Sequence, residues 1–129
     1  MPAASSLRVL VVDDQHTMRM LVRTCLQQLG VADVNEAVDG EDGLRKLVAD
    51  RVHLVIADFN MPKLDGLDLL RAVRTHPPTS KIAYIMLTGR ADKDLVQRAV
   101  QFGVNNYLVK PFSVAALREK IEAVFGPLS

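Results

Sequence analysis

Polar side chains capable of phosphoryl and metal chemistry stand directly after four short apolar segments of the chain. They are Asp13 and Asp14 after residues 8–12, Asp58 after residues 53–57, Thr88 after residues 82–87, and Lys110 after residues 106–109. In an open parallel sheet, functional groups gather beyond the carboxyl ends of the strands. If the four segments are strands of one such sheet, we expect three carboxylates, a hydroxyl and an ammonium to meet at one edge.

The chemistry of such a group follows from its charges. Three neighbouring carboxylates repel one another, and a divalent cation relieves that repulsion. Oxygen ligands suit Mg²⁺, which keeps water positions open for phosphate oxygens. A carboxylate beside the ion can attack a phosphoryl group, while the metal, an ammonium and a hydroxyl stabilise the other oxygens. Each residue alone is typical of a loop or a helix cap, so the prediction depends on their joint occurrence.

The rest of the sequence supports a fold that provides such an edge. The four segments and a fifth at residues 34–37 are mostly continuous apolar runs, as expected for parallel strands buried on both faces. Segments with helical periodicity alternate with them. Gly30 and Gly103 suit helix C-termini, and Ser113 suits the start of the last helix. This alternation predicts an α/β fold with five strands, five helices and right-handed crossovers.

Composition limits the classes of function. The chain has 129 residues and a net charge of +1, with no strongly basic region, so we expect no DNA partner. No apolar run approaches the roughly 20 residues of a membrane helix, and no signal pattern stands at the start. A single cysteine, Cys25, fits a reducing compartment. We therefore expect one cytoplasmic domain over residues 1–129, with a flexible N-terminus at about residues 1–6 and no membrane insertion.

The motifs together resemble those of bacterial two-component response-regulator receiver domains. They are Val11-Val12-Asp13-Asp14, Asp58-Phe59-Asn60-Met61-Pro62, Asp65-Gly66, Thr88-Gly89 and Lys110-Pro111-Phe112. The resemblance covers about residues 7–125 and is strongest to stand-alone members of the chemotaxis type. It implies a flavodoxin-like (βα)5 three-layer sandwich in which the parallel strands have the order 2-1-3-4-5.

The resemblance also implies a role for each site residue. Asp58 would accept a phosphoryl group from a histidine kinase or phosphotransfer protein. Mg²⁺ would be held by Asp13, Asp14, Asp58 and the backbone carbonyl of Asn60, with Asp14 as the most direct ligand. Thr88 and Lys110 would contact the phosphoryl group, and Tyr107 would be the switch aromatic. Asn60 and Arg90 occupy positions that tune phosphoryl lifetime, although Arg90 is equally well read as a solvated loop arginine. The family often has a cis peptide bond before Pro111.

The implied function is a signalling switch rather than a classical enzyme. Phosphorylation would change the face formed by the fourth helix, the fifth strand and the fifth helix, and so regulate a partner protein. A flagellar motor switch protein is the favoured partner, while a phosphorelay intermediate or a regulator of another pathway is also compatible.

The sequence disfavours three other functions. An aspartyl-phosphate phosphatase is disfavoured because Asn60 stands where a second acid is needed. An interaction domain without phosphorylation is disfavoured because every site residue is present. A receiver that is part of a larger regulator is disfavoured by the start at Met1 and by the lack of a linker after Phe125.

Overall fold

A computed structural model describes residues 3–89 and 93–129 of the chain, and its five strands form one parallel sheet. The strands are β1 (Arg8–Val12), β2 (Asp33–Ala37), β3 (Leu54–Asp58), β4 (Ala83–Thr88) and β5 (Asn106–Val109). The helices are α1 (His16–Gln28), α2 (Gly40–Ala49), α3 (Gly66–Thr75), α4 (Lys93–Gln101) and α5 (Val114–Phe125), with short 3-10 helices at Ala4–Ser6 and Pro77–Thr79. The strand order is β2-β1-β3-β4-β5, so the predicted order is confirmed.

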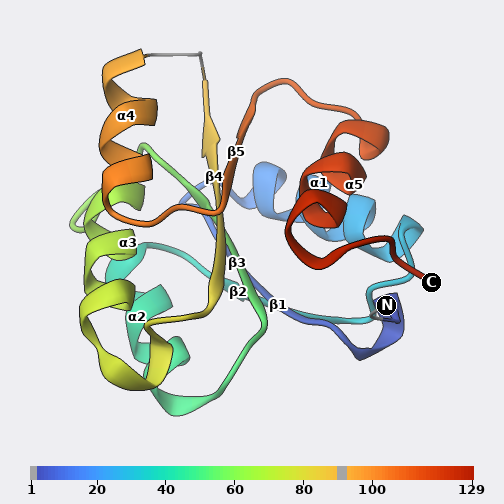
Figure 1. The fold of residues 1–129 in the computed structure, drawn as a ribbon, viewed down its shortest axis with the longest axis horizontal. Helices are drawn as coiled ribbons and strands as arrows, with labels where there is room; N and C mark the ends of the chain where they lie inside the picture. Colours follow the sequence, from blue (N-terminus) through green and yellow to red (C-terminus); the bar gives the residue numbers. More distant parts are fainter. Residues whose placement is uncertain (1–2, 90–92) are drawn as a thin grey trace.

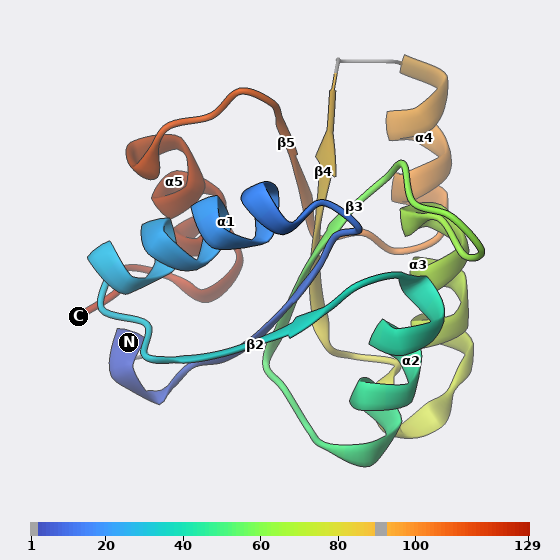
Figure 2. The same ribbon diagram turned by 180° about the vertical axis from the view of Figure 1, so that it is seen from behind.

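The helices lie in two layers on either side of the sheet. Helices α1 and α5 cover one face, and α2, α3 and α4 cover the other (Figures 1 and 2). Each face has its own apolar cluster: Val22 and Leu117 pack in the first, and Leu47 and Leu70 in the second. The three-layer sandwich is therefore confirmed, and the central strands are buried on both faces.

Three strands differ by one residue from the predicted ranges, and two of the shifted strand ends carry site residues. Strand β3 ends at Asp58 and strand β4 ends at Thr88, so these residues are the last of their strands rather than the first of the following loops. The reason is parallel pairing: Asp58 is in register with Leu87, and the next amide, of Phe59, donates to the carbonyl of Leu87 at 2.8 Å. The strand backbone thus fixes the Cα positions of both side chains.

Local turn chemistry begins and ends the helices as the sequence indicates. The side chain of Ser113 accepts a hydrogen bond from the amide of Ala116 at 3.0 Å, and Asp65 caps α3 in the same way. Gly30 and Gly103 follow α1 and α4 with φ near +90°, where a residue without a Cβ is favoured.

The N-terminal segment expected to be flexible contains the 3-10 helix Ala4–Ser6. Ala4 is buried, and its amide donates to the carbonyl of Ser129 at 3.2 Å. The first described residues and the C-terminus accordingly lie side by side (Figure 2).

Candidate functional site

Three carboxylates meet at the carboxyl edge of the sheet. Asp13 and Asp14 follow β1, and Asp58 ends the neighbouring strand β3. One oxygen from each lies within 4.8 Å of the other two. Asp13 is fully buried and Asp58 is 5% exposed, whereas Asp14 is open to solvent. The predicted acidic cluster is thus assembled by the pairing of β1 with β3.

Asp13 is the most constrained member of the cluster. Its Oδ1 accepts a hydrogen bond from the amide of Gln15 at 2.9 Å, while its Oδ2 is buried and has no partner among the described residues. Burial raises the pKa of Asp13 to about 6, the Gln15 amide opposes this rise, and the charge of Asp58 adds to it. A buried oxygen without a donor at this position is suited to a cation.

Lys110 supplies the positive charge at the site. Its Nζ lies 2.6 Å from Oδ1 of Asp58, and both side chains are largely buried. The amide of Lys110 donates to the carbonyl of Thr88 at 2.8 Å, which holds the end of β5 against the end of β4. The peptide bond between Lys110 and Pro111 is cis, as the resemblance implied.

Two hollows open beside these residues. One, of about 390 Å³, is lined by Asp14, Gln15, Asp58, Phe59, Asn60, Met61, Pro62, Gly89 and Lys110. The other, of about 540 Å³, lies between Thr88 and α4 and includes Phe59, Asn60 and Arg98. Thr88 is buried and Asn60 is exposed. The first hollow can admit a phosphoryl donor to Asp58, while Arg90 lies outside the described residues.

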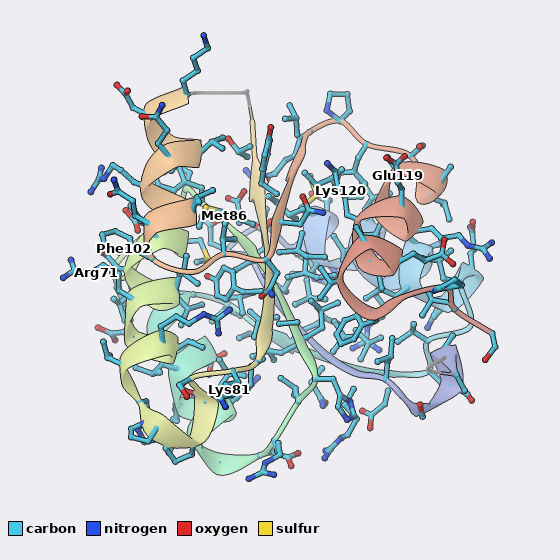
Figure 3. All side chains as sticks on the ribbon, viewed as in Figure 1. Arg71, Lys81, Met86, Phe102, Glu119 and Lys120 are labelled. Atoms are coloured by element: carbon cyan, nitrogen blue, oxygen red, sulfur yellow. The ribbon has the colours of Figure 1, made fainter. Side chains whose placement is uncertain are left out.

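Tyr107 lies on β5 on the same face of the sheet as Thr88. It is in register with Met86, two residues before Thr88, and side chains two apart on a strand share a face. Its ring is partly buried, and Nζ of Lys120 lies 5.3 Å from the ring centre. Figure 3 shows Lys120 on the side of α5 that faces β5. Tyr107 therefore lies between Thr88 and the surface formed by α4, β5 and α5, where a movement of Thr88 can change its contacts.

Sequence reasoning missed several residues that shape the site. Arg19 donates to the backbone carbonyl of Asp13 at 2.6 Å and pairs with Glu36 on β2 at 3.0 Å. The hydroxyl of buried Tyr84 donates to the carbonyl of Gly66 at 2.7 Å, and the amide of Gly66 donates to the carbonyl of Phe59 at 2.8 Å. The links from Arg19 to Glu36 and from Tyr84 to Gly66 join residues 17 and 18 positions apart, and strand pairing brings their segments together.

The donor set fits Mg²⁺. Three carboxylates, one with an unpartnered buried oxygen, stand beside an open hollow that leaves room for water. Oxygen ligands and retained waters are what this ion prefers. The residues that would hold it are Asp13, Asp14 and Asp58.

Comparison with known proteins agrees with this geometry. The response regulator receiver domain profile matches residues 9–122. A probable chemotaxis protein CheY from Rhizobium etli is 51% identical over 128 residues, which cover 99% of each chain.

Two solved structures are similar throughout the fold. The receiver domain of a sensor histidine kinase from Pseudomonas aeruginosa, with a magnesium ion coordinated in its active-site cleft, is 28% identical with a TM-score of 0.84, covering 93% of this chain and 98% of that one. A Borrelia burgdorferi CheX–CheY complex with BeF3 and magnesium contains a chain that is 25% identical with a TM-score of 0.87, covering 92% and 89%.

The chain belongs to the response regulator receiver domain family and, within it, is of the CheY chemotaxis type, with an acidic phosphorylation pocket at Asp13, Asp14 and Asp58. It is accordingly a phosphoacceptor signalling protein rather than a classical enzyme. None of the helices in residues 3–89 and 93–129 is long and apolar enough to cross a bilayer.

Proposed function

We propose that Asp58 accepts a phosphoryl group from a histidine kinase or phosphotransfer protein, with Mg²⁺ held by Asp13, Asp14, Asp58 and the backbone carbonyl of Asn60. The observation that carries this proposal is the Lys110–Asp58 ion pair of 2.6 Å beside two further carboxylates and an open hollow. An ammonium at this distance offsets part of the mutual repulsion of the three carboxylates.

The chemical step needs only groups at this edge. An oxygen of Asp58 forms a bond to phosphorus as the bond from phosphorus to the donor's leaving atom breaks, and the leaving group departs with that electron pair. Lys110 can follow the negative charge onto the phosphoryl oxygens, and Thr88 can donate its hydroxyl proton to one of them. The bound metal ion would neutralise charge on the carboxylates and on the phosphoryl group.

The switch would start at Thr88. A hydroxyl drawn toward the phosphoryl group changes the space on its face of the sheet, where Tyr107 lies two residues from the partner of Thr88 in the strand ladder. Rotation of the Tyr107 ring would alter its contact with Lys120 and so change the surface of α4, β5 and α5. A partner that binds this surface with different affinity before and after phosphorylation of Asp58 would respond to the phosphorylation state.

The relatives named as chemotaxis proteins support a role in chemotaxis. Within that role we propose a flagellar motor switch protein as the downstream partner, in the cytoplasm and without DNA binding. Asn60 and Arg90 are proposed to set the lifetime of the acyl phosphate. An Arg90→Glu variant with a changed half-life for loss of phosphate, measured against wild type, supports the role of Arg90. An unchanged half-life would show that Arg90 does not set the lifetime of the acyl phosphate.

Intact mass spectrometry after incubation with acetyl phosphate tests the central proposal. Wild-type protein should gain one phosphoryl group with Mg²⁺ and none with EDTA, and Asp58→Asn should gain none. Glu41→Gln, which removes an exposed carboxylate on α2 outside the cluster, is the matched control and should behave as wild type. A wild-type chain that gains no phosphoryl group would instead point to an interaction domain that works without phosphorylation.

A further inference from the structure

We propose that Arg19 is a positioning residue for the metal-binding carboxylate of Asp13, and that Glu36 holds Arg19 in place for this role. The inference rests on the proposed function, because it concerns the same acidic site. It adds two residues from α1 and the edge strand β2, neither of which touches the phosphoryl group.

The contacts of Asp13 show why its backbone matters. Its amide donates to the carbonyl of Ala37 at 3.1 Å, and its Oδ1 accepts from the amide of Gln15 at 2.9 Å. Its carbonyl accepts from Nη1 of Arg19 at 2.6 Å. Every hydrogen-bonding group of Asp13 therefore has a partner among the described residues except Oδ2. The three bonds fix the residue and leave one carboxylate oxygen for a cation.

Arg19 is the only one of these three partners that is a side chain, so it is the one that mutation can remove. Its guanidinium bridges two groups: Nη1 reaches the Asp13 carbonyl, and Nε reaches Oε1 of Glu36 at 3.0 Å. The Arg19 side chain is 12% exposed, so this bridge is largely shielded from solvent. A planar guanidinium can make both bonds at once, whereas an ammonium has no fixed fork to do so.

Glu36 anchors the bridge to the sheet. It lies on β2 in register with Val11 of β1, close to the point where β1 ends, and its second oxygen accepts from Arg23 at 2.9 Å. Burial raises the pKa of Glu36, but the hydrogen bonds from Arg19 and Arg23 outweigh it and leave the pKa below its usual value. Glu36 is thus held as a carboxylate, which Arg19 needs as a partner.

Arg23 offers a matched control. It pairs with the same carboxylate and donates to the carbonyl of Val34 at 2.9 Å, but none of its described contacts is with Asp13. Loss of Arg23 therefore removes about as much hydrogen bonding from the edge of the sheet as loss of Arg19. Only loss of Arg19 frees the Asp13 carbonyl, which separates positioning from general stability.

The test is the Mg²⁺ affinity of the unphosphorylated chain, measured by isothermal titration calorimetry for wild type, Arg19→Ala, Arg19→Lys, Arg23→Ala and Asp13→Asn. Urea unfolding of each variant gives its stability separately. Groups that orient metal ligands are worth roughly 10- to 100-fold in metal affinity. We expect Arg19→Ala to weaken Mg²⁺ binding about 10-fold and Arg19→Lys to restore little of it. Arg23→Ala should change the affinity less than 2-fold despite a comparable loss of stability.

The outcomes separate this inference from the proposed function. If wild type binds Mg²⁺, Asp13→Asn does not bind it and Arg19→Ala binds it as well as wild type, the positioning role of Arg19 is wrong. The proposed acidic metal site is then still supported. Equal weakening in Arg19→Ala and Arg23→Ala also overturns it, since the effect then follows stability. Full rescue by Arg19→Lys overturns it because charge alone would suffice. Wild type that binds no Mg²⁺ removes the proposed function and this inference together.

Discussion

Nζ of Lys110 lies 2.6 Å from Oδ1 of Asp58. Asp58 ends β3 and Lys110 follows β5, so the ion pair passes over the end of the strand between them, β4, which ends at Thr88. One ammonium thus faces a cluster of three carboxylates, so only a cation such as Mg²⁺ can offset the remaining negative charge of the site. The ion pair has two opposed effects, because Lys110 repels a metal ion and attracts a phosphoryl group.

Replacement of Lys110 should separate these two effects. In Lys110→Met the side chain keeps its length and loses its charge, so we expect Mg²⁺ to bind equally well or a few-fold more tightly. The rate of phosphorylation by acetyl phosphate should fall at least about 10-fold, because charge stabilisation of the transferring group is lost. Calorimetry and time-resolved intact mass measure the two quantities. Parallel loss of both would show that Lys110 only maintains the fold of the site.

Gly66 should not tolerate alanine even though it stands in the first turn of a helix. A Cβ there would lie 2.5 Å from the carbonyl oxygen of Asp58 and 2.8 Å from Cα of Phe59, and these backbone atoms have little freedom to move. We expect Gly66→Ala to lower the free energy of unfolding by about 2 kcal/mol or more, as overpacking does, and to slow phosphorylation of Asp58. Urea unfolding and intact mass provide the two readouts.

Gly89→Ala is the control for that prediction. No described atom lies within 4 Å of a Cβ at Gly89, so its stability should stay within about 0.5 kcal/mol of wild type. Equal stability of the two alanine variants would show that the turn at Gly66 adjusts without cost.

The sequence predicted the fold well because its signals are local. Apolar runs, helix periodicity and glycines after helices depend on neighbours in the chain, and they located all five strands to within one residue at either end. The acidic cluster was also predictable, since parallel strands bring their carboxyl ends to one edge. The strand order itself came from the family resemblance and not from these patterns.

What the sequence could not predict depends on long-range pairing. Arg19 and Glu36 meet because β2 lies beside β1, and nothing in their types distinguishes them from solvated surface charges. Leu21 is 45% exposed although it lies four residues from buried Cys25 on α1, so helical spacing alone does not show which apolar side chains are buried. The hydrogen bond from the Tyr84 hydroxyl to the Gly66 carbonyl likewise depends on the pairing of β3 with β4.

Removal of the Tyr84 hydroxyl should destabilise the chain. Tyr84→Phe keeps the buried ring but leaves the Gly66 carbonyl without the donor that now lies 2.7 Å away. That carbonyl keeps its helical partner, the amide of Leu70, and loses a second donor, so we expect a loss of about 1 kcal/mol and a matching fall of the urea midpoint. Tyr107→Phe, which alters a partly buried tyrosine on β5, should cost less than about 0.5 kcal/mol and is the matched control. A Tyr84→Phe chain as stable as wild type would show that the bond from the Tyr84 hydroxyl adds nothing to the stability of the fold.

The raised pKa of Asp13 predicts how the stability of the metal-free chain depends on pH. Its pKa is about 6 in the folded chain, against an ordinary value of 3.8. Between these values the folded chain keeps a proton that the unfolded chain has lost. The contribution of Asp13 to stability therefore falls as pH rises from about 4 to about 6 and then levels off, by roughly 1–3 kcal/mol in total.

Asp13→Asn isolates this contribution from those of other carboxyl groups, such as Glu36 and Asp42, whose pKa values are lowered on folding. In EDTA, the variant should match wild type near pH 4 and exceed its stability at pH 7, as urea unfolding would measure. Saturating Mg²⁺ should reverse the order at pH 7, because an ion that binds only the folded wild-type site stabilises it by mass action. A difference between the two chains that is constant from pH 4 to pH 7 would show that folding leaves the pKa of Asp13 unshifted, and would contradict the prediction.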